Sequence, residues 1–414
     1  MAPAEAKGQA MKLAVLLNKF PFNIHDGGAL VSKGLARAVL DCYPNSLILV
    51  PHTFKHPFNY DHIPPHWHPQ QWKAVECHTR VTLKGFISAI MEGRAYHLIR
   101  YQRSPAVSHL VTLVKNYGPQ TIILDGMAGL AFLPIIRKAF PDMPIIYHAH
   151  NVEWKVWQTL CHQTKGQPVR RGALEVLYRL LRREEINTLP LATVVTGVSP
   201  VDVQYFSGIS GVKTVSFLPA ALWDKTPDPV PWPADENTLK LYHVGSMDWQ
   251  PTRQGIELFL DRYWPYLRKK FPEIELHLAG NHMPDTLHKR KLPGLFVHGF
   301  VDSVADFIRD KHICIVPVFA GSGIKVKVIE ALALGRPVIT TPLGAEGLPL
   351  IPDVHVLLAS SPEEFEKQLA YLQSQRNLAV EIAQKGHQVI AKTYHLANTC
   401  QKLREILKQA SEIQ

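Results

Sequence analysis

The chain is poor in cysteine and has no long apolar segment. Its five cysteines are scattered and include no Cys-x-x-Cys pair, which is typical of a reduced intracellular protein and argues against a zinc site. The longest apolar candidate, Thr121 to Ile136, contains Asp125 and three potential breakers, so we expect no membrane-spanning helix. Residues 1–10 have no apolar core and predict a disordered leader rather than a targeting segment. We therefore expect a cytoplasmic protein.

Negative charge is scarce in only one half of the sequence. Residues 1–217 hold 23 Lys/Arg against 13 Asp/Glu, whereas residues 218–414 hold 22 of each. A basic half can meet nucleic acid, an anionic lipid surface or a phosphate-bearing substrate, and a solvated basic surface explains the charge equally well. Aromatic and basic residues do not interleave as in single-strand binders, so we expect no nucleic acid partner.

What the sequence does contain is two runs of short apolar segments that alternate with helical patterns. Such alternation predicts parallel β-α-β units and a doubly wound α/β sheet in each half. The segments of the first run lie at 12–18, 46–51, 121–126, 144–150 and 192–199, and those of the second at 239–246, 274–280, 295–300, 313–318, 337–341 and 355–359.

A proline-rich, aperiodic stretch separates the two runs. We therefore predict a Rossmann-like N-terminal domain over 11–217, a linker over 218–238 and a second Rossmann-like domain over 239–390. The helix over 391–414 is a separate C-terminal element, and a return to the N-terminal domain is one option for it. Two such domains would leave a cleft, with ligands beyond the carboxyl ends of the strands.

Two candidate sites follow strands of the first half. Asp26-Gly27-Gly28 opens a helix, where backbone N–H groups can bind an anion; a plain helix-entry turn with Asp26 as N-cap is the alternative. His148 and His150 lie at the end of the buried strand segment at 144–150 and should point toward the mouth of the cleft. They could contact a sugar hydroxyl or hold a structural bond. A metal would need a third ligand, and none is apparent nearby in the sequence.

Two further candidates lie in the second half. Gly245 ends a strand, and the loop after it leads to Arg253; Trp249 in this loop is expected to pack. Phe319–Val338 reads FAGSGIKVKVIEALALGRPV. Its Lys325 and Lys327 fall at the start of a helix, where the helix dipole disfavours cations. An anionic ligand explains this placement better than stability does, and Glu330, one turn later, could bind a ribose hydroxyl.

Two other features have ordinary explanations that we prefer. The segment VRRGALEVLYRLLRREEINTL places arginines on one helical face and leucines on another. It could lie on a membrane, but a core helix with a solvated basic face is the more common case. The histidine-dense stretch between His52 and His78 has no regular ligand spacing, and we interpret it as loop composition.

Taken in order, the motifs resemble the retaining glycosyltransferases of family 4, which have the GT-B fold. They are FPFNIHDGGA, YHAHNVEW, TGVSPVD, VGSMDWQP, LHLAG, VHGFVDSV and GSGIKVKVIEALALGRPVITTPLGAEGL. The last one is similar to the subgroup with Gly-Ser-Gly-Ile before the helix. NKFPF, DGGA and TFKH resemble a branch that makes bacterial surface polysaccharide.

The resemblance implies transfer of a sugar from a nucleotide-diphosphate donor to a hydroxyl acceptor, without a metal or other cofactor. It places Lys327 and the Gly27-Gly28 backbone on the diphosphate and Glu330 on the ribose. It also implies that His150 contacts the donor sugar near the reacting carbon. The remaining implied contacts are the donor sugar for Gly321, Ser322, Gly323 and Ile324, the base for Phe300 and Val301, and phosphate for Gly245, Arg253 and Lys325.

Two positions depart from the family pattern. Ser322 stands where many members have a glutamate, and Arg253 is alone where many have an Arg and Lys pair. We therefore expect more of the phosphate charge to be met by Lys325 and Lys327.

The sequence thus predicts a metal-independent hexosyltransferase, in surface polysaccharide or glycolipid synthesis. Its N-terminal domain would bind a sugar or lipid-linked acceptor, and its basic half could attach at the inner face of a membrane. The alternatives are another GT-B enzyme, such as an epimerase or phosphorylase, and a non-catalytic binder of nucleotides or nucleic acid.

Overall fold

The chain forms two compact units in the computed structural model, which describes residues 11–22, 27–103, 105–164, 166–233, 238–319 and 323–413, apart from the side chain of Gln163. The residues up to Asp224, together with Leu396–Gln414, make unit 1, and Lys225–His395 make unit 2. The expected leader, residues 1–10, lies outside the described residues. Among the described helices, none combines the length and the apolar character that crossing a bilayer requires.

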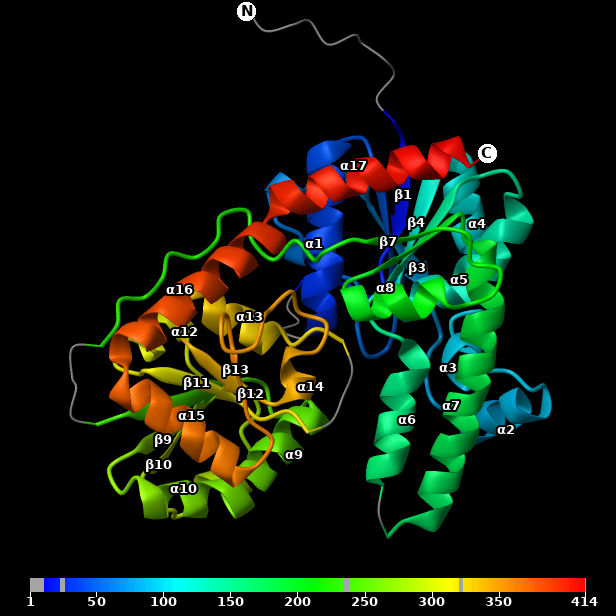
Figure 1. The fold of residues 1–414 in the computed structure, drawn as a ribbon. Coiled ribbons are helices and arrows are strands. Elements are labelled where there is room, and N and C mark those ends of the chain that lie inside the picture. The colour runs from blue at the N-terminus through cyan, green and yellow to red at the C-terminus, as the bar shows by residue number, and fades with distance from the viewer. Residues whose placement is uncertain are drawn as a thin grey trace, which may run out of the picture. The chain divides into compact units, whose positions relative to one another are not determined.

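Unit 1 is built on a seven-stranded parallel sheet with the order β3-β2-β1-β4-β5-β6-β7 (Figure 1). Its central strands carry almost continuous apolar sequence because both faces of the sheet are covered. The strands are β1 Leu13–Leu16, β2 Leu47–His52, β3 Trp72–Glu76, β4 Thr121–Asp125, β5 Ile145–Ala149, β6 Val194–Gly197 and β7 Val215–Phe217.

Helices cover both faces of this sheet, and two of them, α6 and α7, form a long pair (Figure 1). On α7, Leu174 and Leu181 are buried, while Arg179 is exposed and pairs with Glu175, as a core helix with a solvated basic face requires. The helices are α1 Gly27–Cys42, α2 Leu83–Met91, α3 Tyr96–Ile99, α4 Ala106–Tyr117, α5 Gly126–Ala139, α6 Glu153–Gln163, α7 Pro168–Thr188 and α8 Pro200–Ser207.

The C-terminal helix α17, Leu396–Glu412, completes unit 1 by packing along α1 (Figure 1). Its apolar residues recur at helical spacing, so Leu396, Leu403 and Leu407 share one buried face. They join the same core cluster as Leu35 and Val39 of α1. The last helix of the chain therefore belongs to the unit that contains the first strand.

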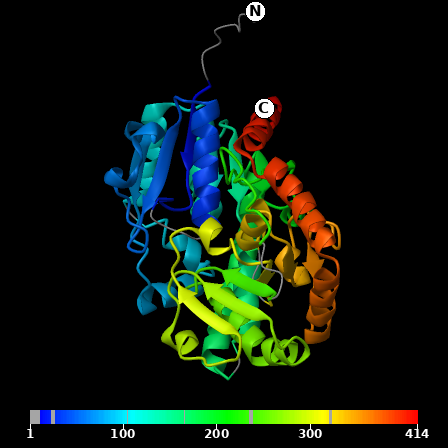
Figure 2. The ribbon, with the colours of Figure 1, turned by 90° about the vertical axis from the view of Figure 1, so that its left-hand side faces the viewer.

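Unit 2 repeats the architecture with six parallel strands in the order β10-β9-β8-β11-β12-β13. Figure 2 shows its strands as green and yellow arrows, with α15 and α16 in orange to one side. The strands are β8 Lys240–Val244, β9 Glu275–Ala279, β10 Leu295–Gly299, β11 Ile313–Val316, β12 Val338–Thr340 and β13 Leu357–Leu358.

The helices of unit 2 begin where the sequence has start signals. Ser361 caps α15, because its side chain accepts a hydrogen bond from the N–H of Glu364. The elements are α9 Gln250–Leu258, a π-helical turn Phe259–Tyr263, α10 Trp264–Lys270, α11 Asp285–His288, α12 Val304–Phe307, α13 Val326–Ala333, α14 Pro342–Ala345, α15 Pro362–Ser374 and α16 Arg376–Thr393.

Arg336, after α13, is fully buried in unit 2. Its guanidinium donates to four backbone carbonyls, those of Lys311, Val230, Pro231 and Ile308. The Gly-Arg-Pro that ends the motif at 319–338 is therefore structural, since one cation ties three separate loops together.

The predicted doubly wound sheets are confirmed in both units. In unit 1 the structure adds two outer strands, β3 and β7, that the sequence analysis missed. β3 ends the histidine-dense stretch, which also contains three short 3-10 turns, Tyr60–His62, Pro65–Trp67 and Pro69–Gln71. Short outer strands carry a weaker apolar signal than central ones because one of their edges has no neighbour.

Candidate functional site

Each sheet has one place where the strand order reverses direction, and doubly wound folds bind ligands beyond the carboxyl ends of the strands there. In unit 1 this place lies between β1 and β4, and in unit 2 between β8 and β11. Polar residues gather at both places, and each group is described within its own unit.

In unit 1, the carboxylate of Asp125 at the end of β4 is the centre of a buried hydrogen-bond network. Its Oδ1 lies 2.5 Å from Nε2 of His150, just after β5. Its Oδ2 accepts from the Ser32 hydroxyl of α1 at 2.6 Å and from the backbone N–H of Asn18, after β1, at 2.9 Å. Three parallel strands and a helix thus converge on one fully buried carboxyl group.

The charge of this network is set by the contacts around Asp125. Burial alone would raise the pKa of Asp125, but His150 above all, with His148 and Ser32, holds it below its ordinary value. Burial lowers the pKa of His148 to about 4, so this ring is neutral at pH 7. Nδ1 of His148 is bonded to the Thr196 hydroxyl at 2.8 Å. His148 is thus bonded to Thr196, and His150 is the ring that is hydrogen-bonded to the Asp125 carboxylate.

Two expectations about these histidines need correction. They were expected to point toward an open mouth, but His148 and His150 are both buried because each is bonded to a neighbouring strand. No third metal ligand was expected, yet Asp125 supplies one, and the three donor atoms lie within 4.8 Å of one another. The sequence concealed this residue because Asp125 precedes His150 by a full β-α-β unit.

Gly27 and Gly28 are the first two residues of α1, as the anion-site interpretation requires. Gly27 is exposed and Gly28 is half-buried. One turn further on, Ser32 bonds to Asp125, so the start of α1 is connected to the His150 network. Asp26, the proposed N-cap, lies outside the described residues.

A second buried polar pair supports the strand end that carries His150. The carboxyl group of Glu185 on α7 accepts from the backbone N–H of Glu153, the first residue of α6, at 3.1 Å. Burial raises the pKa of Glu153 to about 7, and burial together with Glu153 raises the pKa of Glu185 to about 8. Both side chains thus favour the protonated form well above the range of an ordinary glutamate.

In unit 2, three neighbouring strands have a glycine at or directly after their last residue, which leaves a rim without side chains: Gly245 after β8, Gly280 after β9 and Gly299 at the end of β10. The N–H of Gly245 donates to Ala279 and that of Gly280 to the carbonyl of Gly299. Gly280 has a φ of +141°, and a Cβ there would lie 1.9 Å from the carbonyl oxygen of Gly245. Gly280 therefore has to be glycine, and Gly299, with a φ of +75°, has a backbone conformation that favours glycine, so a ligand can approach the backbone closely.

Lys327 of α13 lies against this rim. A Cβ at Gly245 would come within 2.0 Å of its Cε, so the side chain occupies the space that Gly245 leaves open. Burial, partly offset by Glu330, lowers the pKa of Lys327.

The sequence analysis missed His243, the buried neighbour of Lys327. Its Nδ1 bonds to the carbonyl of Ile315 at 2.9 Å, which leaves Nε2 buried without a partner among the described residues. That Nε2 lies 3.2 Å from the Cβ position of Gly245. Burial, followed by the charge of Lys327, lowers the pKa of His243 to about 4, so a neutral ring presents an unused acceptor beside the lysine.

The loop before α13 carries further predicted residues. Gly323, with a φ of +76°, and Ile324 are half-buried, whereas Gly321 and Ser322 lie outside the described residues. The Lys325 ammonium donates to the carbonyl of Gly323. Glu330 is exposed on α13, one turn beyond Lys327.

The loops after β8 and β10 fit the sequence-based roles less uniformly. Arg253 pairs with Glu257 along α9 at 3.0 Å. Phe300 is 65% exposed after β10, and Val301 is half-buried. Trp249, which we expected to pack, is 53% exposed. The prediction that Trp249 packs is therefore wrong.

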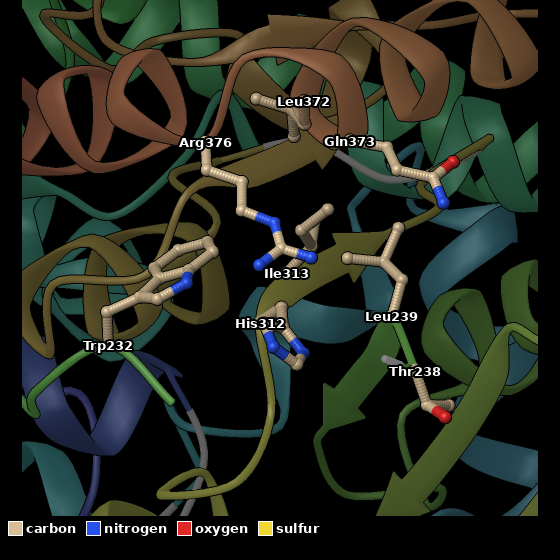
Figure 3. Close-up of a pocket in the computed structure, with 8 residues that line it drawn as sticks. All are labelled: Trp232, Thr238, Leu239, His312, Ile313, Leu372, Gln373 and Arg376. Atoms are coloured by element: carbon tan, nitrogen blue, oxygen red, sulfur yellow. The ribbon is translucent and has the colours of Figure 1, made fainter. Parts of the chain in front are cut away.

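A small pocket in unit 2 lies elsewhere. It holds about 20 Å³, which is room for a water molecule rather than a sugar. Leu239 and Ile313 place it at the amino ends of β8 and β11, and Figure 3 shows Arg376 pointing into it from α16. It is therefore at the wrong end of the sheet for the predicted chemistry.

Residues 238–375 match the family model described as Glycosyl transferases group 1. No curated protein matches the sequence at a significant level.

Solved structures with a similar fold cover nearly the whole chain. Sucrose-phosphate synthase from Thermosynechococcus elongatus superposes with a TM-score of 0.65 and 13% identity, over 98% of this chain and 100% of that one. HepE of Anabaena in complex with UDP-glucose gives 0.62 and 13%, over 96% and 99%. The lipopolysaccharide outer core galactosyltransferase WaaB gives 0.60 and 14%, over 96% and 99%.

Two parallel sheets with this strand order, and structural neighbours that span the chain, establish the GT-B fold. Within it, the segment from 238 to 375, which contains Gly245, Lys327 and Glu330, is the part of the chain that is similar to the group 1 glycosyl transferases.

Proposed function

We propose that the protein is a retaining, metal-independent hexosyltransferase, which moves a sugar from a nucleotide-diphosphate donor to a hydroxyl acceptor. The observation that carries the proposal is the contact between Lys327 and Gly245. It joins two motifs, 82 residues apart, at the carboxyl edge of the sheet in the domain that matches group 1. A lysine and a bare glycine rim at such an edge suit a diphosphate.

In this proposal unit 2 holds the donor. Lys327 binds the diphosphate, and Glu330, one turn further along α13, binds the ribose. Phe300 and Val301 border the base, while the segment from Gly321 to Ile324 faces the sugar. The exposure of Phe300 and Glu330 in unit 2 is consistent with contact to a ligand.

Lys327 has the main chemical task in unit 2. The bond between the anomeric carbon and the diphosphate breaks, and negative charge develops on the leaving diphosphate. A fixed ammonium placed before the reaction begins stabilises that charge without reorganisation. The acceptor hydroxyl forms the new glycosidic bond with retained configuration, and its proton passes to an oxygen of the leaving diphosphate.

In unit 1 we assign His150 to the donor sugar, and Asp125 to positioning His150. The hydrogen bond between Asp125 and His150 fixes which ring nitrogen faces inward. The Gly27-Gly28 start of α1 offers backbone N–H groups to an anion, and a sugar or lipid-linked acceptor is assigned to this unit.

Two structural neighbours suggest where to begin with substrates. HepE was crystallised with UDP-glucose, and WaaB is a lipopolysaccharide galactosyltransferase. We accordingly propose UDP-hexoses as the first donors to examine, and surface polysaccharide or glycolipid synthesis as the setting.

The proposal is tested by ligand-induced thermal stabilisation, because a ligand that binds only the folded chain raises its melting temperature. The wild type is compared with Lys327→Ala over a panel of nucleoside diphosphates and UDP-hexoses. We expect at least one nucleotide to stabilise the wild type and to lose most of this effect in Lys327→Ala.

Lys269→Ala, which removes an exposed cation of α10, is the matched control and should respond like the wild type. Donor hydrolysis with each stabilising UDP-hexose then reports turnover. The proposal would be overturned if no nucleotide of the panel stabilised the wild type. It would also be overturned if Lys327→Ala showed the stabilisation and donor hydrolysis of the wild type.

A further inference from the structure

A second surface of unit 1 has no place in the proposed chemistry. Seventeen large apolar side chains are exposed among the described residues, and five of them fall within residues 81–91, on or next to α2. Clustering of this kind marks an interaction surface, whereas single exposed apolar residues are ordinary. We call the set the α2 ridge; it consists of Phe54, Val81, Leu83, Ile87, Ile90 and Met91.

The helix α2 is docked with its small residues inward. Ala89 is fully buried, and a Cβ at Gly85 would touch Tyr96 of α3. The large residues Leu83 and Met91 point the other way and are 75% and 83% exposed. A helix of a water-soluble surface normally has the opposite arrangement. The outer face of α2 is therefore suited to an apolar environment.

Several contacts fix the orientation of α2 on unit 1. The Thr82 side chain caps α2 by accepting from the N–H of Gly85. Phe86 packs edge-to-face on Tyr96 at 5.8 Å, and the hydroxyl of Tyr96 accepts from the backbone N–H of Thr82. Arg94, just after α2, pairs with Glu184 of α7. The ridge therefore projects from a fixed support.

Cations surround the ridge. The Arg80 guanidinium lies 4.6 Å from the centre of the Phe54 ring, and Arg80 directly precedes Val81 in the chain. Lys84 is exposed on α2, Lys55 follows Phe54, and Arg103 lies beside Gly85. Glu92 is the acid nearest in sequence to this face, and it is hydrogen-bonded to Ser88. The patch thus combines an apolar crest with a basic border.

We propose that the α2 ridge binds the surface of an anionic phospholipid bilayer, lying in the plane of the interface. Apolar residues that enter the acyl boundary, flanked by Lys and Arg at headgroup level, are the chemistry that such a surface recognises. A second copy of the same ridge is disfavoured because Arg80 and Lys84 would meet their like charges. The excess basic charge of residues 1–217 is consistent with the same partner.

The test is flotation of the purified full chain with vesicles at low salt. Equimolar phosphatidylcholine and phosphatidylglycerol should carry the protein, and pure phosphatidylcholine should carry much less. Added salt should weaken the binding, because it screens the basic border. The combined variant Leu83→Ser, Ile87→Ser and Met91→Ser should bind about tenfold less or weaker still.

Arg80→Gln with Lys84→Gln should reduce binding to anionic vesicles by roughly fivefold for each cation removed. Val169→Ser is the matched control, because Val169 is an equally exposed apolar residue of unit 1 outside the ridge. It should float like the wild type. Nucleotide-induced stabilisation, measured on every variant, should stay unchanged, which separates this proposal from the proposed function and shows that the variants fold.

Three outcomes would overturn the proposal. The first is a wild type that does not float with anionic vesicles at low salt, and the second is a triple variant that floats as well as the wild type. The third is a wild type that sediments as a dimer without lipid while the triple variant is monomeric, which would make the ridge a contact between copies.

Discussion

The two units place chemistry at the same position of the same fold, yet they hold it differently. In unit 1 the groups are buried and bonded to one another: Asp125 has partners just after β1, on α1 and just after β5. In unit 2 Lys327 is half-buried, and Nε2 of its neighbour His243 is buried with no hydrogen-bond partner in the part of the chain that the structure describes.

This difference indicates that two equivalent sheet edges can have different roles, one in positioning a side chain and the other in binding a ligand. A closed network fixes the position of one group, His150, whereas an open rim of glycines leaves room for a ligand beside Lys327. We therefore expect changes in unit 1 to act through positioning and changes in unit 2 to act on donor binding.

The largest effect is expected for Asp125→Asn, which keeps the shape but removes the charge that faces His150. Misplacing a catalytic group by about 1 Å can cost on the order of 10²-fold in rate, and we expect a loss of roughly that size in kcat/KM. The loss should appear in kcat more than in KM, because the substitution disturbs the orientation of the His150 ring rather than the groups that bind the donor.

Ser32→Ala is the milder companion of this change, since it removes one donor to Asp125 and leaves the charge. It should show a smaller loss of kcat. A kcat in Asp125→Asn equal to that of the wild type would refute the positioning role.

Gly245→Ala should be next in size. Its methyl group would lie 2.0 Å from Cε of Lys327, so the lysine must move away from the rim. We expect nucleotide affinity to fall about tenfold, which is the loss of a displaced charge-assisted contact of about 1.4 kcal/mol.

Gly172→Ala, in a helix of unit 1 where nothing lies within 4 Å of the added methyl, is the control and should bind nucleotide normally. Titration calorimetry on both variants makes the comparison. Tight binding by Gly245→Ala would show that the position of Lys327 does not matter for the donor.

The buried glutamates of unit 1 predict a pH dependence of stability. The folded-state pKa of Glu185, about 8, lies above its unfolded value, as does that of Glu153 at about 7. Folding therefore retains protons, and the stabilisation present at low pH is lost as pH rises toward 8, by up to about 1.4 kcal/mol per pH unit for each of the two carboxyl groups.

Glu185→Gln should flatten this slope, because glutamine does not ionise and can still accept from the N–H of Glu153. Melting temperatures between pH 5 and 8 give the readout. If the wild type and the variant lose stability in parallel, the two glutamates do not control this dependence.

The smallest effect is expected for Arg253→Ala. The guanidinium is engaged with Glu257 and 45% exposed, and exposed ion pairs of this kind contribute about 0–1 kcal/mol. Donor affinity should change by less than roughly fivefold. A loss as large as that of Lys327→Ala would instead give Arg253 a direct phosphate contact.

The sequence by itself determined the two doubly wound sheets, the strand ends that carry His150 and Gly245, and the helix start that carries Lys327. It could do so because apolar periodicity and glycine placement are local signals, legible within a few residues. The outer strands β3 and β7 were missed, since short edge segments give that signal weakly.

Only the tertiary structure decided which of these residues act together. Asp125 meets His150 across a β-α-β unit, Gly245 makes room for a lysine 82 residues later, and Arg336 binds carbonyls about 100 residues before it. The outward orientation of α2 was equally hidden, because Leu83 and Met91 would suit a core helix just as well. Which apolar face is buried depends on what the rest of the chain packs against it, and no local pattern records that.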